Sequence, residues 1–132
     1  MATIFTRIID GELPGRFVYT DERCVAFLSI NPLRPGHVLV VPRVEVEHWI
    51  DLPADEWNHL TTVARHLGRA LQRAYQPAKV GMMLAGLEVP HVHIHLVPID
   101  GIHDLDFDNA DPDPAAGALD EAAATIRAAI ES

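Results

Sequence analysis

The sequence predicts an α+β fold, in which a mostly antiparallel five-stranded sheet packs against one long central helix, with a short N-terminal helix and a C-terminal helical extension. Two observations lead to this class. Short runs rich in β-branched and apolar residues recur between turn residues, at 16–20, 24–30, 37–42, 79–86 and around 91–96. The stretch 54–75 instead repeats its apolar residues every three or four positions, which is the period of a helix.

The N-terminal stretch predicts a short amphipathic helix. Its apolar residues come in pairs one helical turn apart (Ile4, Phe5, Ile8 and Ile9). Thr3 is a candidate N-cap, because its hydroxyl can accept a hydrogen bond from the first turn, and Gly11 is a candidate C-cap. We therefore expect a helix that begins after Thr3 and ends near Gly11.

Three strands are expected next. "RFVYT" (16–20) and "CVAFLSI" (24–30) are separated only by "DER", which suits a hairpin. "NPLRPG" (31–36) contains two prolines and a glycine, so it is a turn-rich connector. "HVLVVP" (37–42) then follows as the third strand.

The long helix is predicted over 54–75, and Pro53 suits its first turn. A stripe of three arginines on another face is expected to be solvated (Arg65, Arg69 and Arg73). His59 and His66 lie off the main apolar stripe, and we assign them no function. "KVGMMLAG" (79–86) predicts the strand that follows.

The last third of the chain is acidic and then helical. The segment 100–114 contains six aspartates and no lysine or arginine, which predicts a solvated surface loop. Residues 114–130 repeat apolar side chains at helical spacing, which predicts an amphipathic helix docked on the rest of the fold. Because no linker divides the chain, we expect residues 1–132 to form one domain, with a core at about 3–98 and an extension at 99–132.

Composition excludes several classes of function. The net charge of −9 argues against a nucleic-acid binder, which needs a basic surface for the phosphate backbone. No apolar run approaches the ~18 residues of a membrane span. Asp10 and Glu12 interrupt the N-terminus, so no signal peptide is expected, and Cys24 is the only cysteine. We therefore expect a cytoplasmic protein with no membrane association.

The most informative stretch is "VPHVHIHLVP" (89–98), which places histidines at three alternate positions. Because side chains of a strand alternate between its faces, His91, His93 and His95 share one face, about 6–7 Å apart from one to the next. They could be the polar face of a half-buried strand, ligands of a metal ion such as zinc, or catalytic groups. Convergence of all three on one ion is awkward along a strand.

Catalysis suits this arrangement of imidazoles. A neutral imidazole is available at physiological pH, and its nitrogen can attack phosphorus and later leave. Neighbouring imidazoles can donate hydrogen bonds to phosphoryl oxygens and to the leaving group. His37, which opens the strand 37–42, is a fourth candidate.

Several motifs together resemble one known family. "HVHIHLV" is similar to the His-φ-His-φ-His-φ-φ motif of the histidine triad (HIT) superfamily of nucleotide hydrolases and transferases. "IFTRIIDGELP" and "ERCVAFLSINPLRPGHVLVVPR" resemble the Hint-like branch of that family, so that the likeness extends over about residues 3–98. The resemblance implies a HIT-like fold and a homodimer whose two sheets join. The long helix and the strand before the triad would form that interface.

The resemblance also implies roles for individual residues. His93 matches the family nucleophile, which forms a nucleotidyl-histidine intermediate at the α-phosphate, and His95 matches the histidine near the leaving group. His91 and His37 match the histidines that orient the nucleophile and line the phosphate site. Apolar positions that enclose the base fall on Ile4, Phe5, Ile8, Phe27 and Ile30, and Val89 adjoins the phosphate loop. Plain core packing is an equally good interpretation of Ile8 and Phe27.

This chain departs from the family pattern at three nucleotide-binding positions. Ser29 stands where Asp or Asn usually binds the ribose hydroxyls. In "VGMMLAGLEVPH", Leu87 stands in the place of a glutamine and Glu88 in the place of a hydroxyl that contacts phosphate. A carboxylate would repel a bound phosphate, so either Glu88 points away or the substrate differs from a standard nucleoside monophosphate ester.

The metal-binding pattern of some family members is also missing. Their structural zinc uses two cysteines and a histidine, and here these places hold Thr3, Thr6 and Glu45. We therefore expect no metal and no cofactor. The extension beyond residue 99 would either cap the nucleotide cleft or pad the dimer.

The sequence thus predicts a hydrolase or nucleotidyl transferase that acts on a phosphoramidate or a dinucleoside polyphosphate. A nucleotide-binding or interaction module with the same fold and little turnover is the second hypothesis. A histidine-ligated metallohydrolase is the third.

Overall fold

The computed structural model describes residues 2–131. Five strands form one sheet in the order β1-β2-β3-β5-β4, and each neighbouring pair is antiparallel. The strands are β1 (Phe17–Thr20), β2 (Cys24–Leu28), β3 (Val38–Pro42), β4 (Lys79–Met83) and β5 (Ile94–Ile99). The predicted α+β class and five-stranded antiparallel sheet are confirmed.

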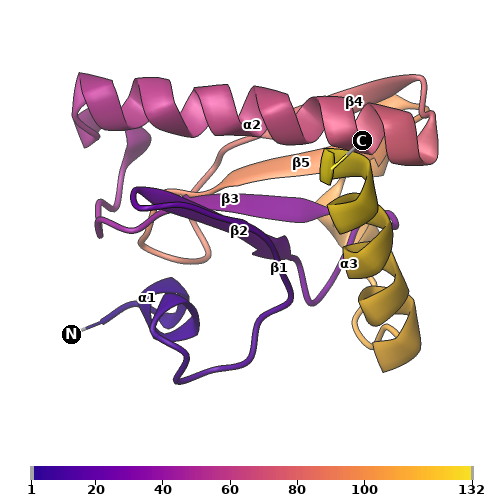
Figure 1. The fold of residues 1–132 in the computed structure, drawn as a ribbon, viewed down its shortest axis with the longest axis horizontal. Helices are drawn as coiled ribbons and strands as arrows, with labels where there is room; N and C mark the ends of the chain where they lie inside the picture. Colours follow the sequence, from indigo (N-terminus) through magenta and orange to yellow (C-terminus); the bar gives the residue numbers. More distant parts are fainter. Residues whose placement is uncertain (1, 132) are drawn as a thin grey trace.

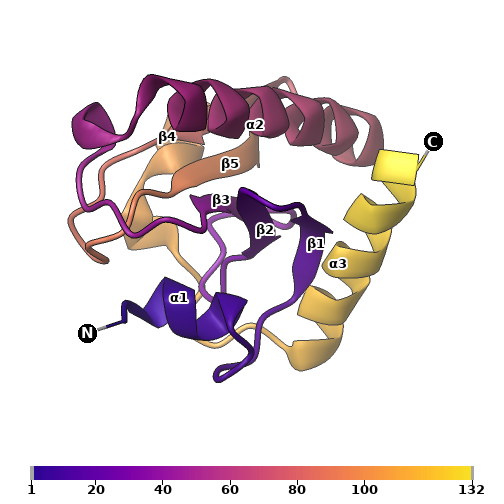
Figure 2. The same ribbon diagram turned by 60° about the vertical axis from the view of Figure 1, so that its left-hand side comes forward.

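Helices lie on both faces of this sheet. The long helix α2 (Ala54–Tyr75) runs along one face, and the short helix α1 (Ile4–Ile9) lies on the opposite side, as Figures 1 and 2 show. The C-terminal helix α3 (Ala116–Glu131) packs beside β1 and against α2. Three short 3₁₀ turns complete the fold: η1 (Trp49–Asp51), η2 (Ile102–Leu105) and η3 (Phe107–Asn109).

The two faces of the sheet bury two separate apolar clusters. Ala26, Val40 and Ile94 belong to the larger cluster, together with residues of α2 and α3. Phe27 and Leu39 belong to the smaller cluster on the α1 side. Because both faces are covered, β2 and β3 are buried along their whole length, and this explains why their sequences are continuously apolar rather than alternating.

The cross-strand register places the histidines on the α1 face. Phe27 is the partner of Leu39, and Leu39 is the partner of His95, so these three side chains stand in one row across the sheet. His37 lies two residues before Leu39, and His93 two residues before His95, which adds them to the same face. The sheet thus gathers histidines from β5 and from the segments just before β3 and β5 over one surface.

The histidine strand begins later than predicted. Hydrogen-bonded β5 starts at Ile94, so His91 and His93 precede it in an extended segment. The register would pair Val92 with Pro42, which has no N–H to donate, and the ladder between β3 and β5 stops before that point. His91 nevertheless remains on the α1 side, since Phe5 of α1 contacts the rings of both His91 and His93.

Other boundaries shift by a few residues. Thr3 caps α1 as predicted, accepting a hydrogen bond from the Thr6 N–H, but the C-cap is Asp10 rather than Gly11. The strand predicted over 79–86 ends at Met83, and the segment 84–93 forms a loop beside the histidines.

Gly36 explains the tight turn before β3. Its φ of +93° favours glycine, and a Cβ atom there would lie 2.7 Å from the Tyr75 ring. This close approach lets the turn 31–36 pack under the end of α2 and deliver His37 to the sheet. No helix within residues 2–131 has both the length and the apolar character that crossing a membrane requires.

Candidate active site

A cavity of about 640 Å³ lies on the α1 face of the sheet. It is bounded by α1, the ends of β2 and β3, the loop 84–93 and η3. All of the site residues predicted from the sequence line it except His91, which lies behind it: Ile4, Phe5, Ile8, Phe27, Ser29, Ile30, His37, Glu88, Val89, His93 and His95. Its walls are mainly apolar, with polar groups concentrated at the histidines.

His93 is held so that one ring nitrogen faces the cavity. Its Nδ1 lies 2.7 Å from the carbonyl oxygen of His91, and because a carbonyl can only accept, Nδ1 carries a hydrogen and donates it. The ring is 1% exposed, and its edge packs against Phe5 with the ring centroids 4.9 Å apart. In the neutral ring the lone pair is therefore on Nε2, the nitrogen that faces Glu88 and the cavity.

A chain of hydrogen bonds determines the tautomer of His95. The main-chain N–H of Leu33 donates to Nδ1 of His37 at 3.0 Å. The other nitrogen of a neutral His37, Nε2, must then carry the hydrogen, and it donates to Nδ1 of His95 at 2.9 Å. Consequently Nε2 of a neutral His95 carries a hydrogen and presents it to the cavity.

Burial keeps the rings of His37 and His95 neutral. It lowers the pKa of His37 to about 3, with a further contribution from the positive charges that His95 and His93 can carry. Burial, followed by the charge of His93, also lowers the pKa of His95 below its ordinary value. At physiological pH, His95 is thus a neutral hydrogen-bond donor with a defined direction.

His91 acts on the other side of His93. Its Nε2 donates to the carbonyl oxygen of Pro42 at 2.7 Å, and its Nδ1 lies 2.7 Å from the Thr3 hydroxyl. Burial lowers the pKa of His91, which keeps the ring neutral between these two partners. His91 does not line the cavity. Its main-chain carbonyl holds His93, while His37 positions His95.

Glu88 points into the site. Its Oε1 lies 2.7 Å from Nε2 of His93 and 3.3 Å from Nε2 of His95, although the side chain is 48% exposed. Partial burial raises the pKa of Glu88, but the hydrogen bonds from the two histidines and the charge of His93 outweigh it, so the pKa lies below its ordinary value. Leu87, by contrast, is 93% exposed and turns to solvent.

The apolar wall divides into core and surface residues. Phe5 and Phe27 are buried and pack edge to face, so they serve the smaller core cluster as well as the cavity, with Ile8 and Val89 partly buried against it. Ile4 and Ile30 are exposed. Exposed isoleucines at the mouth of a cavity have no core to stabilise, which fits a surface that an apolar ligand covers.

Ser29 lies on the cavity wall beside Ile30. Its Oγ accepts a hydrogen bond from the main-chain N–H of Asn31 at 3.2 Å, which anchors the start of the turn before β3. The hydroxyl hydrogen of Ser29 remains available to a ligand oxygen in the cavity.

The acidic segment is only partly the solvated loop that the sequence predicts. Asp104 is buried, receives the main-chain N–H groups of Asp100 and Gly101, and forms an ion pair with Arg34 at 2.7 Å. This anchor brings Phe107 against the ring of His95, with the centroids 5.1 Å apart, and Phe107 lines the cavity. Phe107 was missed from the sequence because it is a lone aromatic residue in an aspartate-rich run.

Arg16 is a second residue of the cavity that the sequence did not single out. It lies at the rim and pairs with Asp120 of α3 at 2.8 Å. Arg16 is held by a residue of the C-terminal extension, and Phe107 belongs to that extension, so neither position at the cavity is specified by a local motif.

The histidines are poorly arranged as metal ligands. Glu88, His93 and His95 bring three ligand atoms within 4.8 Å of one another. To coordinate a metal through Nε2, however, His95 would need its hydrogen on Nδ1, and His37 would then need one on its own Nδ1, where the N–H of Leu33 already points. Two donors would face each other in a buried place, so the set offers an ion two ligands rather than three.

Thr3, Thr6 and Glu45, the positions that the resemblance matches to structural zinc ligands of some relatives, lie together at the start of α1. The main-chain N–H of Thr3 donates to Glu45 at 2.8 Å, and the Thr3 hydroxyl contacts both Thr6 and His91. These groups are hydroxyl and carboxylate oxygens joined by hydrogen bonds, rather than the soft thiolates that zinc prefers.

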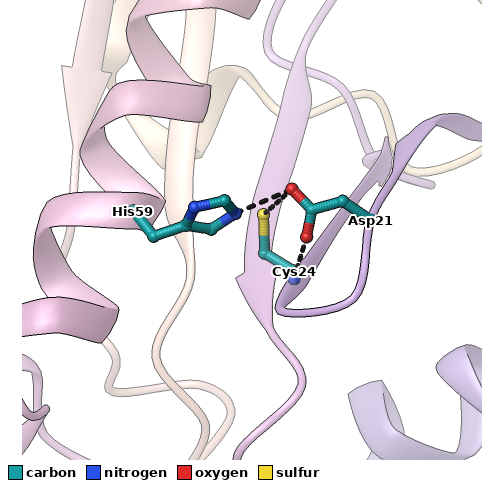
Figure 3. Close-up of side chains that lie close together, drawn as sticks. All are labelled: Asp21, Cys24 and His59. Atoms are coloured by element: carbon teal, nitrogen blue, oxygen red, sulfur yellow. Dashed lines mark hydrogen bonds and ion pairs between the residues drawn. The ribbon is translucent and has the colours of Figure 1, made fainter.

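A second polar cluster lies away from the cavity (Figure 3). Asp21, in the β1–β2 turn, accepts the N–H groups of Arg23 and Cys24 on one oxygen. Its other oxygen lies 2.7 Å from Nε2 of His59 on α2 and 2.8 Å from the Tyr19 hydroxyl. His59, to which the sequence gave no function, thus joins α2 to the hairpin.

Comparison with known proteins agrees with this geometry. The family model described as "HIT domain" matches residues 10–102. An uncharacterized HIT-like protein of Methanocaldococcus jannaschii is 38% identical over 99 residues, covering 72% of this chain and 77% of the relative. The adenosine 5'-monophosphoramidase of Saccharomyces cerevisiae is 32% identical over 98 residues, covering 74% of this chain and 62% of the relative.

A solved structure extends the likeness to the C-terminal part. The HIT-like protein of Bartonella henselae superposes with a TM-score of 0.85 at 28% identity, covering 96% of this chain and 95% of that one. The matched family model, the sequence relatives and the shared fold lead to one conclusion: this chain belongs to the histidine triad (HIT) family.

Proposed function

We propose that this protein cleaves nucleotidyl compounds at the α-phosphate through a covalent nucleotidyl-histidine intermediate on His93. The observation that carries the proposal is that two neighbouring ring nitrogens face the cavity in opposite hydrogen-bonding states, one as an acceptor and one as a donor. In the neutral rings, Nε2 of His93 presents a lone pair to the cavity and Nε2 of His95 presents a hydrogen. A nucleophile beside a fixed donor is what a displacement at phosphorus requires.

In the first step, Nε2 of His93 attacks the α-phosphorus, and a nitrogen–phosphorus bond forms while the bond from phosphorus to the leaving group breaks. The Nδ1–H of His93 donates to the His91 carbonyl, which stabilises the positive charge that the ring acquires. The Nε2–H of His95 donates a hydrogen bond to the leaving atom and stabilises the charge developing there, and an amine leaving group takes up a proton from the solvent.

In the second step, water attacks the same phosphorus and the nitrogen–phosphorus bond breaks. The electron pair of the broken bond returns to Nε2 and restores the imidazole, the attacking water gives up one proton to the solvent, and a nucleoside monophosphate is released. Another acceptor in place of water would make the protein a nucleotidyl transferase.

The proposed substrate is a phosphoramidate or a dinucleoside polyphosphate. Within the family, we propose that the protein belongs to the Hint-like branch. The monophosphoramidase relative supports the first substrate class. The exposed isoleucines Ile4 and Ile30 and the ring of Phe107 support an apolar place for the base, and Ser29 supports a contact to the ribose.

The test compares wild type with His93→Ala, using adenosine 5'-phosphoramidate as substrate and AMP as ligand. We expect wild type to release AMP, and the variant to lose turnover by about 10³-fold or more while it still binds AMP. Turnover by His93→Ala at the wild-type rate would refute the proposal.

A nucleotide-binding module with little turnover is the second candidate. The contact between Glu88 and Nε2 of His93 favours it, since a hydrogen-bonded carboxylate occupies the attacking nitrogen. If wild type binds AMP but turns over no member of a panel of phosphoramidates and dinucleoside polyphosphates, this second function is the correct one.

We also propose a homodimer joined through β4 and α2. β4 is an edge strand of the sheet, Met82 on it is 60% exposed, and Gly68 of α2 leaves a shallow groove beside Val80. A second copy that pairs with this edge would continue the sheet and cover the groove.

Two further proposals concern the whole chain. We propose that residues 1–132 act as one domain, which the packing of α3 on β1 and α2 supports. We propose a reducing, cytoplasmic location, which the buried free thiol of Cys24 supports.

A further inference from the structure

The carboxylate of Glu88 lies where a substrate phosphoryl group must lie. In-line attack needs phosphorus about 3–3.5 Å from Nε2 of His93. Oε1 of Glu88 is already 2.7 Å from that nitrogen and 3.3 Å from Nε2 of His95. A substrate can therefore bind productively only after the Glu88 side chain has moved, which its half-exposed position at the mouth of the cavity allows.

The same contact also covers the attacking nitrogen. Nδ1 of His93 donates to the His91 carbonyl, so Nε2 is the ring nitrogen left to attack, and Oε1 of Glu88 lies directly against it. The nucleophilic nitrogen is therefore covered until the Glu88 side chain moves away.

After it moves, Glu88 still carries its negative charge close to the bound phosphoryl group. The residue is attached only five positions before His93, and Val89 beside it lines the same cavity. Nucleotidyl groups differ in how strongly this charge repels them. A nucleoside monophosphate is a dianion above its second pKa, about 6, whereas an α-phosphoryl group that bears an ester or amide substituent is a monoanion.

We propose that Glu88 selects ligands by the charge of the α-phosphoryl group, disfavouring dianionic nucleoside monophosphates relative to substituted, monoanionic nucleotidyl groups. The proposal rests on the proposed function, since it assumes that the cavity binds nucleotides. Substituted nucleotides are the substrates of that function and nucleoside monophosphates are its product. Glu88 therefore weakens the binding of the product more than the binding of the substrate, although either ligand must first displace its side chain.

The experiment measures the dissociation constants of AMP and of its methyl ester by titration calorimetry at pH 8. The ester has one negative charge where AMP has two, and it is otherwise nearly the same ligand. Wild type is compared with Glu88→Gln and Glu88→Ser. The matched control is Glu22→Gln, which removes one carboxylate from the β1–β2 turn, outside the residues that line the cavity.

The ratio of the two constants is the deciding quantity, because capping and steric effects act on both ligands alike and cancel in it. In both Glu88 variants we expect the preference for AMP over the ester to rise about three- to tenfold, and in Glu22→Gln to stay as in wild type. The change should shrink at pH 5.5, where AMP is largely a monoanion.

Two results would overturn the proposal, and only the second would also overturn the proposed function. If both ligands bind and the ratio is the same in wild type and in the Glu88 variants, charge selection is wrong while the nucleotide site stands. If neither ligand binds wild type or the variants, the cavity is not a nucleotide site and the proposed function falls as well.

Discussion

Single main-chain groups decide what the histidines of this protein can do. The carbonyl of His91 directs the hydrogen of His93 away from the cavity, and the N–H of Leu33 directs, through His37, the hydrogen of His95 toward it. Two imidazoles of the same residue type thus present opposite groups to a ligand. This difference arises from packing and is invisible in the motif, where the two histidines look equivalent.

The role of His95 can be tested through the leaving group. If its Nε2–H stabilises charge on the leaving atom, His95→Ala should lower kcat/KM about 10²-fold for an alkyl phosphoramidate of AMP, and much less for its p-nitrophenyl ester, which leaves readily without help. Both substrates are assayed under identical conditions, with His66→Gln on α2 as the control. An equal loss for the two substrates would show that His95 acts elsewhere.

The buried neutral state of His37 predicts a pH dependence of stability. Its pKa is about 3 in the folded protein and about 6.5 when unfolded. Between these values only the unfolded chain takes up the proton, so the free energy of unfolding should fall as the pH falls, by up to about 1.4 kcal/mol per pH unit from this group. The stabilising condition is therefore a pH above 6.5.

Urea denaturation between pH 7 and pH 4.5 checks this. His37→Asn keeps an acceptor for the Leu33 N–H but cannot be protonated, so we expect a flatter dependence than in wild type. The same substitution at exposed His103 should leave the wild-type slope unchanged. If His37→Asn has the wild-type slope, His37 is not the group that titrates.

At the scale of elements, the site is an assembly of four parts that meet only in the folded chain. α1 brings Phe5 against His93, the turn before β3 brings His37 against His95, the loop after β4 brings Glu88, and η3 brings Phe107. The sheet supplies the rigid centre. Its register at Leu39 and His95 sets the spacing between β5 and β3, the strand that His37 immediately precedes.

The contact between the β1–β2 hairpin and α2 yields a prediction for stability alone. Hydrogen bonds from Cys24, Tyr19 and His59 depend on the one carboxylate of Asp21. Asp21→Asn should lower the free energy of unfolding by about 2 kcal/mol, because an amide cannot accept all of these donors. Turnover per folded molecule should not change, since the cluster lies outside the cavity.

Urea denaturation at pH 7 measures this effect, with the neighbouring Glu22→Gln as the matched control. The pH dependence of stability adds a second observation. Burial raises the pKa of Asp21, but its hydrogen bonds outweigh this effect and lower the pKa below its ordinary value. The stabilisation should be present above pH 4 and be lost as the pH falls further, toward the pKa of the folded state. A variant as stable as wild type would show that the cluster contributes nothing.

At the scale of the whole molecule, the sequence predicts the sheet, the helices and the four histidines, because each depends on a local pattern. Strand-like runs, one helical period and the alternation of His91, His93 and His95 are all readable from neighbouring residues. The orientation of Glu88 and the approach of Phe107 are not, because each depends on contacts between distant segments. The prediction of a solvated loop at 100–114 was wrong at Asp104 for the same reason, because the partner of Asp104, Arg34, lies 70 residues away in the sequence.

The proposed dimer is tested by light scattering after size-exclusion chromatography. Met82→Glu places a charge on the exposed edge of β4 and should convert a dimer into a monomer, because two carboxylates would be buried at the interface. Ile102→Glu, an equally drastic change at a side chain outside the groove, should leave the dimer intact. A wild-type protein that elutes as a monomer would contradict the assembly.

The most direct test of the central claim is to observe the covalent intermediate. Wild type and His93→Ala are mixed with a stoichiometric amount of adenosine 5'-phosphoramidate, quenched in denaturant without acid, and analysed by intact mass and by peptide fragmentation. We predict that wild type gains the mass of one adenylyl group, located on His93, and that the variant gains none. An adduct on another residue, or turnover by wild type through direct attack of water with no adduct at any time, would contradict the account.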